Sequence, residues 1–345
     1  VKNLLVRTTA VIAALIGMVS ARTGYAQSVA AARTAATPAP IASYVPNRVY
    51  DSRKNKWIDF ETLVQRANAM DIVFVGEQHD NTPGHEMERA LLEGIARRRG
   101  TGGGPVTLSL EMFERDVQEP LNAYLNGTLD ETTFLAASRP WPNYGPDYRP
   151  LVQLSKAQKW PVIAANIPRT FASLVSRGGL NAFDTLSTDI RRTQIAADIS
   201  CPDDRYGKLF KSWFGEAMNG AGHGAPAAGP TVSADSLKVL AISAAATEQR
   251  YYEAQCVKDE TMGESIALAL SNAQARGNGA LVVHMNGSFH TDYGLGTADR
   301  ALRRAKGAKN MVITMLPTPD LDAVDAKPLR KKADYIVFTV GKPES

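Results

Sequence analysis

Residues 71–86 read DIVFVGEQHDNTPGHE, and this stretch decides the fold class. Residues 72–75 are a short apolar run rich in β-branched side chains, which is typical of a buried strand. The run reaches a glycine, and Glu77, His79 and Asp80 follow directly. Ligands of open parallel sheets bind beyond the carboxyl ends of the strands. The stretch therefore predicts a buried parallel strand that delivers ionisable side chains to a site.

Similar apolar runs recur along the chain, and helical patterns separate most of them. The runs occupy residues 105–113, 160–168, 280–290, 310–317 and 334–340. Residues 84–99 carry an apolar helical stripe and end in three arginines, where cations interact favourably with the helix dipole. The repeated alternation of strand and helix predicts an α/β fold, with a mainly parallel sheet and helices on both faces.

The pattern changes between about residues 180 and 277. This region carries helical patterns but no run typical of a strand, and a Gly/Ala/Pro-rich stretch at 219–233 divides it. We therefore expect a helical insertion in the α/β core, or a helical cap on it. Both cysteines of the chain, Cys201 and Cys256, lie in this region. They form either a disulfide, as in exported proteins, or two free buried thiols.

The N-terminal end has the composition of an export signal. In residues 1–26, basic residues precede an apolar segment too short to span a bilayer, and small residues follow it. Residues 27–47 are rich in Ala, Pro, Ser and Thr, which predicts a flexible linker before a domain at 48–345. Cleavage after residue 26 would remove three basic residues and lower the formal charge from +4 to +1. We expect a periplasmic or secreted protein that does not bind nucleic acid.

Candidate site residues follow the predicted strands. Glu77 and His79 come after the first strand, Glu111 ends the second, Arg169 follows the third, and His290 follows the fourth. The set of His79, His290 and Glu111 would suit Zn²⁺, Mn²⁺ or Fe²⁺. Alternatively, one carboxylate of the group activates water directly and Arg169 stabilises an anionic intermediate. The chain has no Gly-x-Ser-x-Gly motif and no phosphate-binding loop, which argues against serine hydrolases and NTP-using enzymes.

Two further histidines are assigned to other roles. His85 lies in the first turn of a predicted helix, and we expect its ring on the surface. His284 lies inside a predicted strand, and we expect it to pack in the core. His79 and His290 are therefore the histidine pair of the predicted site.

Aromatic residues gather in a proline-rich segment at 138–158. Trp141, Tyr144 and Tyr148 stand among four prolines, ahead of a predicted helix. Rigid aromatic side chains can pack on a flat ligand, and a tyrosinate can ligate ferric haem. The same residues would serve equally well to cover the core.

Six segments in fixed order resemble a known family. They read VFVGEQHDNTPGHEME, LSLEMF, the loop at 141–148, NIPR, YEAQCVKDETM and VVHMNGSFHTDYGLG. Together they resemble the ChaN-like haem-binding uptake proteins, which share a superfamily with the Tiki and TraB proteases and the erythromycin esterases. Members share two Gly-x-x-His motifs, matched here by Gly76–His79 and Gly287–His290, and a glutamate matched by Glu111.

The resemblance implies one of two functions. ChaN-like members bind haem in the cell envelope for iron uptake. For this chain that implies haem ligated by Tyr148, with Tyr144 and Trp141 as further haem-binding residues, at the interface of a homodimer. It also implies a haem receptor in the envelope as a partner. Tiki-like members imply the alternative, a divalent-metal-dependent hydrolase that uses the Gly-x-x-His pair.

Overall fold

The computed structural model describes residues 44–100, 104–220 and 234–342, with the backbone alone at 217–220 and 234–242. From Val45 onward, the described chain forms one compact unit. Within it, no helix is both long and apolar enough to cross a membrane.

Three sequence predictions concern residues outside this description. The predicted leader at 1–26 lies wholly outside it, and so does the predicted linker up to residue 43. The Gly/Ala/Pro-rich stretch lies outside it from residue 221 to residue 233.

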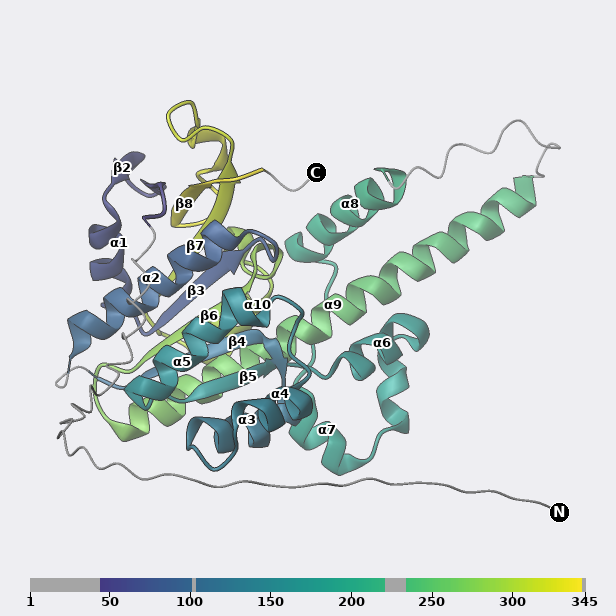
Figure 1. The fold of residues 1–345 in the computed structure, drawn as a ribbon. Helices are drawn as coiled ribbons and strands as arrows, with labels where there is room; N and C mark the ends of the chain where they lie inside the picture. The colour runs from purple at the N-terminus through teal and green to yellow at the C-terminus, as the bar shows by residue number, and fades with distance from the viewer. Residues whose placement is uncertain (1–43, 101–103, 221–233, 343–345) are drawn as a thin grey trace, which may run out of the picture. The chain divides into compact units, whose positions relative to one another are not determined.

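The described strands form one sheet in the order β2-β1-β8-β7-β3-β6-β4-β5 (Figure 1). The strands are β1 (Asn47–Asp51), β2 (Lys56–Ile58), β3 (Ile72–Glu77), β4 (Val106–Glu114), β5 (Val162–Asn166), β6 (Leu281–Gly287), β7 (Asn310–Thr318) and β8 (Tyr335–Val340). Neighbouring strands from β8 to β5 are all parallel, whereas β1 pairs antiparallel with β2 and β8. The predicted mainly parallel sheet is confirmed, and every predicted strand is present.

The antiparallel edge is the part of the sheet that the sequence pattern does not predict. Its strand β2 has three residues, and β1 begins within the predicted linker. The edge is held by contacts that pair distant residues, such as those of the Trp57 ring, whose centroid lies 5.9 Å from that of Phe338 in β8. Short strands of this kind depend on partners that periodicity alone cannot reveal.

Helices cover both faces of the sheet. The α-helices are α1 (Phe60–Ala67), α2 (Thr82–Arg99), α3 (Gln118–Leu125), α4 (Glu131–Ser138), α5 (Arg149–Gln158), α6 (Arg169–Gly178), α7 (Thr188–Gln194), α8 (Arg205–Gly220), α9 (Ala234–Arg276) and α10 (Thr297–Arg304). Short helical turns are η1 (Arg115–Val117), the π-helical η2 (Tyr144–Tyr148), η3 (Leu180–Thr185), η4 (Ser288–His290), η5 (Asp292–Gly294) and η6 (Lys327–Leu329).

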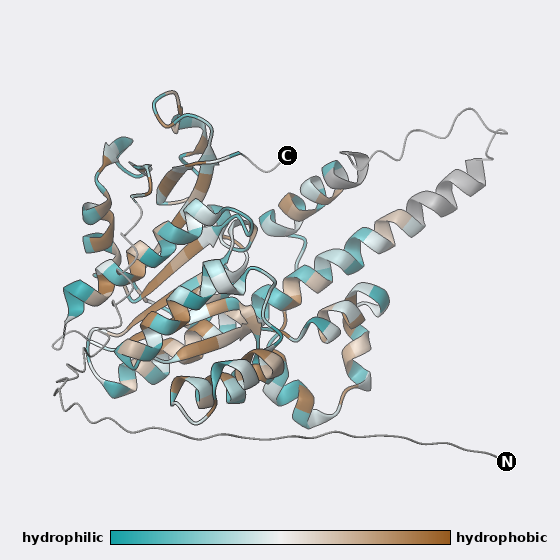
Figure 2. Cartoon of the chain, viewed as in Figure 1, coloured by the Kyte–Doolittle hydropathy of each residue, from teal (hydrophilic) through white to brown (hydrophobic). Residues whose placement is uncertain are grey.

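Alternating residues of each central strand serve two separate cores. Val73 and Val75 of β3 belong to the core under α1, α2 and α5. Ile72 and Phe74 face the other way and pack with the apolar residues of α9 and α10. This alternation explains why the strand is apolar on both sides. Figure 2 shows the hydrophobic colour running along the central strands.

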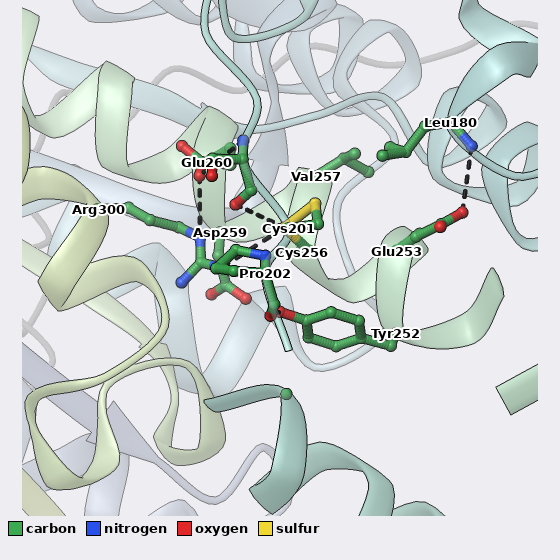
Figure 3. The surroundings of a disulfide bond; sticks show 12 residues. Leu180, Cys201, Pro202, Tyr252, Glu253, Cys256, Val257, Asp259, Glu260 and Arg300 are labelled. Carbon is green, nitrogen blue, oxygen red and sulfur yellow. Dashed lines mark hydrogen bonds and ion pairs between the residues drawn. A yellow bond between two sulfur atoms is a disulfide. The ribbon is translucent and has the colours of Figure 1, made fainter. Parts of the chain in front are cut away.

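The predicted helical region contains η3, α7, α8 and the 43-residue α9, and no strand occurs in its described part. Cys201, ahead of α8, forms a disulfide with Cys256 of α9 (Figure 3). The sequence left this pairing open, and the structure resolves it. The bond ties the segment between α7 and α8 to the middle of α9, next to the ion pair between Glu260 and Arg300.

Candidate functional site

The two Gly-x-x-His motifs lie side by side because β3 and β6 are parallel neighbours. In their ladder Glu77, the last residue of β3, is the partner of Gly287, the last residue of β6. Both strands therefore end at the same position along the sheet. The strand register therefore brings His79 and His290 to one edge of the sheet.

The glycine of each motif makes room for the other motif. A Cβ atom on Gly76 would lie 2.8 Å from the Cα atom of Ser288. A Cβ atom on Gly287 would lie 2.9 Å from the ring of His79. Both separations are shorter than those that real Cβ atoms adopt, so a side chain at Gly76 would have to move the backbone of the second motif, and one at Gly287 would have to move the His79 ring.

Glu77 links the first motif to the tyrosine loop. Its Oε1 atom accepts hydrogen bonds from Nδ1 of His79, at 2.7 Å, and from the hydroxyl of Tyr148. The Glu77 side chain is 2% exposed, whereas that of His79 is 47% exposed. The Trp141 ring packs edge-on against His79, with 4.6 Å between the ring centroids. A buried carboxylate thus fixes one ring nitrogen of His79, and the other nitrogen lies toward Gly287.

A second group forms around His290. Its Nδ1 atom lies 2.7 Å from Oδ1 of Asp259 on α9, and its Nε2 atom lies 3.3 Å from Oε1 of Glu111. The other Glu111 oxygen accepts a hydrogen bond of 2.7 Å from the Gly287 amide. Glu111 lies where the register of the β4–β5 pairing shifts, an irregularity that can redirect a side chain. The predicted residues Glu77, His79, Glu111 and His290 therefore lie in one site.

The proximity of these groups sets their charges. Burial by itself lowers the pKa of His290, but Glu111 and Asp259 outweigh burial and raise it to about 10. Burial also lowers the pKa of His79, but the hydrogen bond to Glu77 and the charge of Glu111 outweigh burial and raise that pKa above its usual value. Burial would raise the pKa of Glu111, but the two histidines and the Gly287 amide hold it below its usual range. His290 and Glu111 therefore carry opposite charges at neutral pH.

Behind Glu77 lies a second buried group, here named the His85 cluster. It consists of Glu77, His85, Glu88 and Asp147, and all four residues are buried. The Nδ1 atom of His85 lies 2.9 Å from Glu88 Oε2 and 3.6 Å from Glu77 Oε2. Burial lowers the pKa of His85, but the three carboxylates of the cluster outweigh burial and raise it to about 10. Burial and the neighbouring charge of Glu77 raise the pKa of Glu88 to about 8.

The position of His85 corrects the sequence prediction, which placed its ring on the surface. The side chain is 1% exposed, because His85 and Glu88 share the face of α2 that packs inward. Its ring also packs edge-on against Tyr148, with 5.0 Å between the centroids. The prediction for His284 is confirmed, since it is fully buried and its Nδ1 lies 2.9 Å from the hydroxyl of Ser109. Burial lowers the pKa of His284 to about 3, so this ring is neutral.

The structure also shows which three residues could hold a metal. Among the described residues, one group of three offers donor atoms that all lie within 4.8 Å of one another, namely Glu77, His85 and Glu88. This group differs from the predicted set of His79, Glu111 and His290, although it shares the carboxylate that holds His79.

Arg169 lies apart from the histidine pair. Its Nε atom pairs with Glu114 Oε1 at 2.6 Å, and neither Glu77 nor Glu111 is its partner. Its side chain is 63% exposed and lines a groove of about 520 Å³. The groove lies between α6, α8 and α9, and its other lining residues include Phe210, Trp213, Phe214, Tyr251, Gln255 and Lys258.

Gln255 connects this groove to the site. Its Nε2 atom lies 3.2 Å from Nε2 of His290, while the residue also lines the groove. A ligand in the groove would therefore lie beside the His290 group.

The two tyrosines predicted to ligate haem lie inside the protein. Tyr148 is 2% exposed and its hydroxyl donates to Glu77, while Tyr144 is 4% exposed. Burial raises the pKa of both phenols, and the charge of Glu77 raises that of Tyr148 further. The loop covers the core and Glu77, and neither tyrosine lines the groove.

Several residues of the site could not be predicted from the sequence. Asp259 lies in a helical pattern, and only the packing of α9 beside β6 brings it to the histidine. Glu88 could have been found, because its spacing of three from His85 places both on one helical face. Trp213 and Tyr251 are exposed aromatic residues on helices, where periodicity alone would assign such residues to the core.

The class of protein is defined by a mainly parallel α/β sheet, paired Gly-x-x-His motifs at its carboxyl edge and an added helical part. A family model described as haem-binding uptake, Tiki superfamily, ChaN matches residues 63–301. The chain belongs to this family, which confirms the resemblance of its motifs. A comparison with curated proteins gives no match.

Solved structures of similar fold include a ChaN of Campylobacter jejuni, described as showing cofacial haem binding to that protein. The TM-score is 0.56 at 16% identity, over 86% of this chain and 97% of that one. A Bacillus cereus protein gives a TM-score of 0.40 at 12% identity, over 75% of this chain and 70% of that one. A mutant of the erythromycin esterase EreC in its open conformation gives a TM-score of 0.38 at 10% identity, over 86% of this chain and 83% of that one. At 16% identity, the match to the Campylobacter jejuni ChaN supports the fold alone.

Proposed function

We propose that the chain binds haem in the groove between α6, α8 and α9 and acts in haem uptake at the cell envelope. The observation that carries this proposal is the aromatic lining of the groove, where Trp213 is 53% and Tyr251 is 48% exposed. Exposed apolar patches of this kind mark binding sites. The flat apolar faces of haem match such rings, which favour stacked or edge-on packing.

The groove also offers charge and size suited to haem. Arg169 and Lys258 line it and can pair with the two carboxylates that haem carries. Its volume of about 520 Å³ lies within the range of roughly 300–1,000 Å³ found for small-molecule pockets.

Tyr251 is the residue of this groove that we propose as the iron ligand. Tyrosinate is an established ligand of ferric haem. Tyr251 lines the groove and is half-exposed, so its phenol can reach a ligand placed there. The family resemblance implies this role for Tyr148, whose hydroxyl is buried and held by Glu77.

The proposal includes a homodimer and an envelope location. The Campylobacter jejuni ChaN is described as binding haem cofacially, and we propose that a second copy of this chain facing the groove would provide such an arrangement here. The Cys201–Cys256 disulfide suits an oxidising compartment outside the cytosol, as the predicted leader at 1–26 does. A haem receptor of the envelope would then deliver or accept the ligand.

A hemin titration of the purified chain tests the proposal. We expect a saturable Soret band in the wild type and an affinity at least about tenfold lower in Tyr251→Phe, which removes the phenolate ligand. Tyr293→Phe is the matched control, because Tyr293 is 36% exposed but lies in η5 and not in the groove. Light scattering with and without hemin would report on the dimer.

The variants separate the two tyrosine assignments. If Tyr148→Phe loses the band while Tyr251→Phe keeps it, haem binds through the loop and not in the groove. A wild type without any saturable band contradicts haem binding altogether.

A second candidate function is hydrolysis at the histidine pair. It is favoured by the number of charged groups at the site, which exceeds what haem ligation by a tyrosine requires. Glu111 faces His290 at 3.3 Å, and Asp259 supports His290 from the other side at 2.7 Å. In such an enzyme Glu111 would activate water, while the histidines would stabilise the developing oxyanion.

An assay of ester and peptide libraries tests this second function. We expect Glu111→Gln to lose activity by about 10²-fold or more, because the general base is removed while its shape is kept. Tyr251→Phe should hydrolyse as the wild type does, since Tyr251 lines the groove and is not one of the charged groups at the histidine pair. A wild type inactive on both libraries argues against a hydrolase.

A further inference from the structure

The His85 cluster contains more carboxylate oxygen than its hydrogen bonds use. Oε2 of Glu77 and Oε1 of Glu88 have no hydrogen-bond partner among the described residues. Both side chains are buried, at 2% and 0% exposure. A buried carboxylate oxygen without a partner is costly. A cation held by these oxygens would remove that cost.

We propose that Glu77, His85 and Glu88 bind one divalent first-row metal cation. Each offers a donor atom, and the three atoms all lie within 4.8 Å of one another. Donors bound at about 2.1 Å to one ion lie roughly 3–4 Å apart, so small side-chain movements close the site. One imidazole with two carboxylates suits Mn²⁺, Fe²⁺ or Zn²⁺.

The second ring nitrogen of His85 supports this assignment independently. Its Nε2 atom lies 3.2 Å from the carbonyl oxygen of His79 and 3.9 Å from Oδ2 of Asp147. The Asn143 amide donates to both of these oxygens at 2.8 Å and so holds them in place. Histidines that bind metals usually donate their other N–H to a carbonyl or carboxylate. This leaves Nδ1, the nitrogen facing the two glutamates, for the cation.

The cation has a positioning role in this arrangement. It binds Oε2 of Glu77, while Oε1 of the same carboxylate holds His79 and Tyr148. It therefore fixes the group that orients His79 and replaces the hydrogen bonds that the two glutamates lack. The inference does not depend on haem binding, because none of the three ligands lines the groove.

The test measures metal content and thermal stability of the full chain. The chain is stripped with EDTA, titrated with MnCl₂ or ZnCl₂ in a calorimeter, gel-filtered and analysed for metal. We expect one ion per wild-type chain and a higher melting temperature with the ion, because a ligand of the folded state stabilises it. Glu88→Gln keeps the shape but loses the charge, and should bind the ion at least about tenfold more weakly.

Two variants of the other group serve as controls. Glu111→Gln and His290→Asn should each retain one ion per chain, because neither residue belongs to the His85 cluster. Loss of the ion in either of them overturns the proposal in favour of the set of His79, Glu111 and His290. If Glu88→Gln does not fold, these two controls still show which of the two residue sets binds the ion.

The wild type alone can overturn the proposal as well. If neither cation binds stoichiometrically or raises the melting temperature, no metal occupies the cluster. A proton on Glu88, whose pKa is raised to about 8 by burial and by the charge of Glu77, then takes the place of the cation.

Discussion

Cys201→Ser/Cys256→Ser is expected to lower the free energy of unfolding by about 4 kcal/mol. The disulfide joins residues 55 positions apart, and the chain-entropy model gives a stabilisation of this size for such a loop. Part of the loss should appear at the site, because Asp259 lies three residues after Cys256 on α9 and holds His290. Denaturant unfolding followed by circular dichroism measures the change.

Reductant provides the control for this prediction. Reduced wild type should unfold at the same denaturant concentration as the double variant, and the double variant should not respond to reductant. Wild type whose thiols become alkylatable without any shift of its unfolding midpoint would show that the disulfide does not stabilise the fold.

Glu260→Gln is expected to cost about 3 kcal/mol or more of unfolding free energy. Glu260 is fully buried and pairs with three arginines of α10: with Arg300 at 3.3 Å, and with Arg303 and Arg304 at 2.7 Å each. The substitution keeps the shape but removes the charge, which leaves the 2%-exposed Arg300 without its carboxylate partner. Removing one partner of a buried ion pair is strongly destabilising for this reason. Chemical denaturation at neutral pH measures the loss.

Glu61→Gln is the matched control. Glu61 also pairs with two arginines at 2.7 Å, but its side chain is 51% exposed. Exposed ion pairs of this kind contribute about 1 kcal/mol or less. Equal losses in the two variants would mean that burial does not decide the strength of the Glu260 pairs.

The fold was largely predictable because its central strands are buried on both sides. A strand such as β3 is apolar at every position from Ile72 to Val75, and this apolar run stops at Gly76, which marks it clearly in the sequence. The hairpin of β1 and β2 was not predictable, because its residues are held by the pairing of β1 with β8 and by the packing of Trp57 against Phe338. Such contacts join residues that are far apart in the chain, so local patterns do not contain them.

The site was predictable where it depends on strand ends and not where it depends on helix packing. Glu77 and His79 follow from the carboxyl end of β3 in a parallel sheet. Glu111 was expected to end its strand but lies within β4, where the pairing with β5 shifts register. His85 was misplaced because a first-turn helical histidine usually faces solvent, whereas here three carboxylates surround the ring. Asp259 lies on a helix of 43 residues, and nothing in its sequence shows which turn meets the sheet edge.

The paired glycines have a consequence for how this chain can vary. Because Gly76 packs on Ser288 and Gly287 packs on the His79 ring, the two motifs behave as one unit although more than two hundred residues separate them. A side chain at Gly76 would meet the backbone Cα atom of Ser288, which no substitution in the second motif removes. A side chain at Gly287 would meet only the end of the His79 side chain and would displace it. Gly76 is therefore the less replaceable of the two glycines, and a change at Gly287 alters the position of a histidine in the other motif.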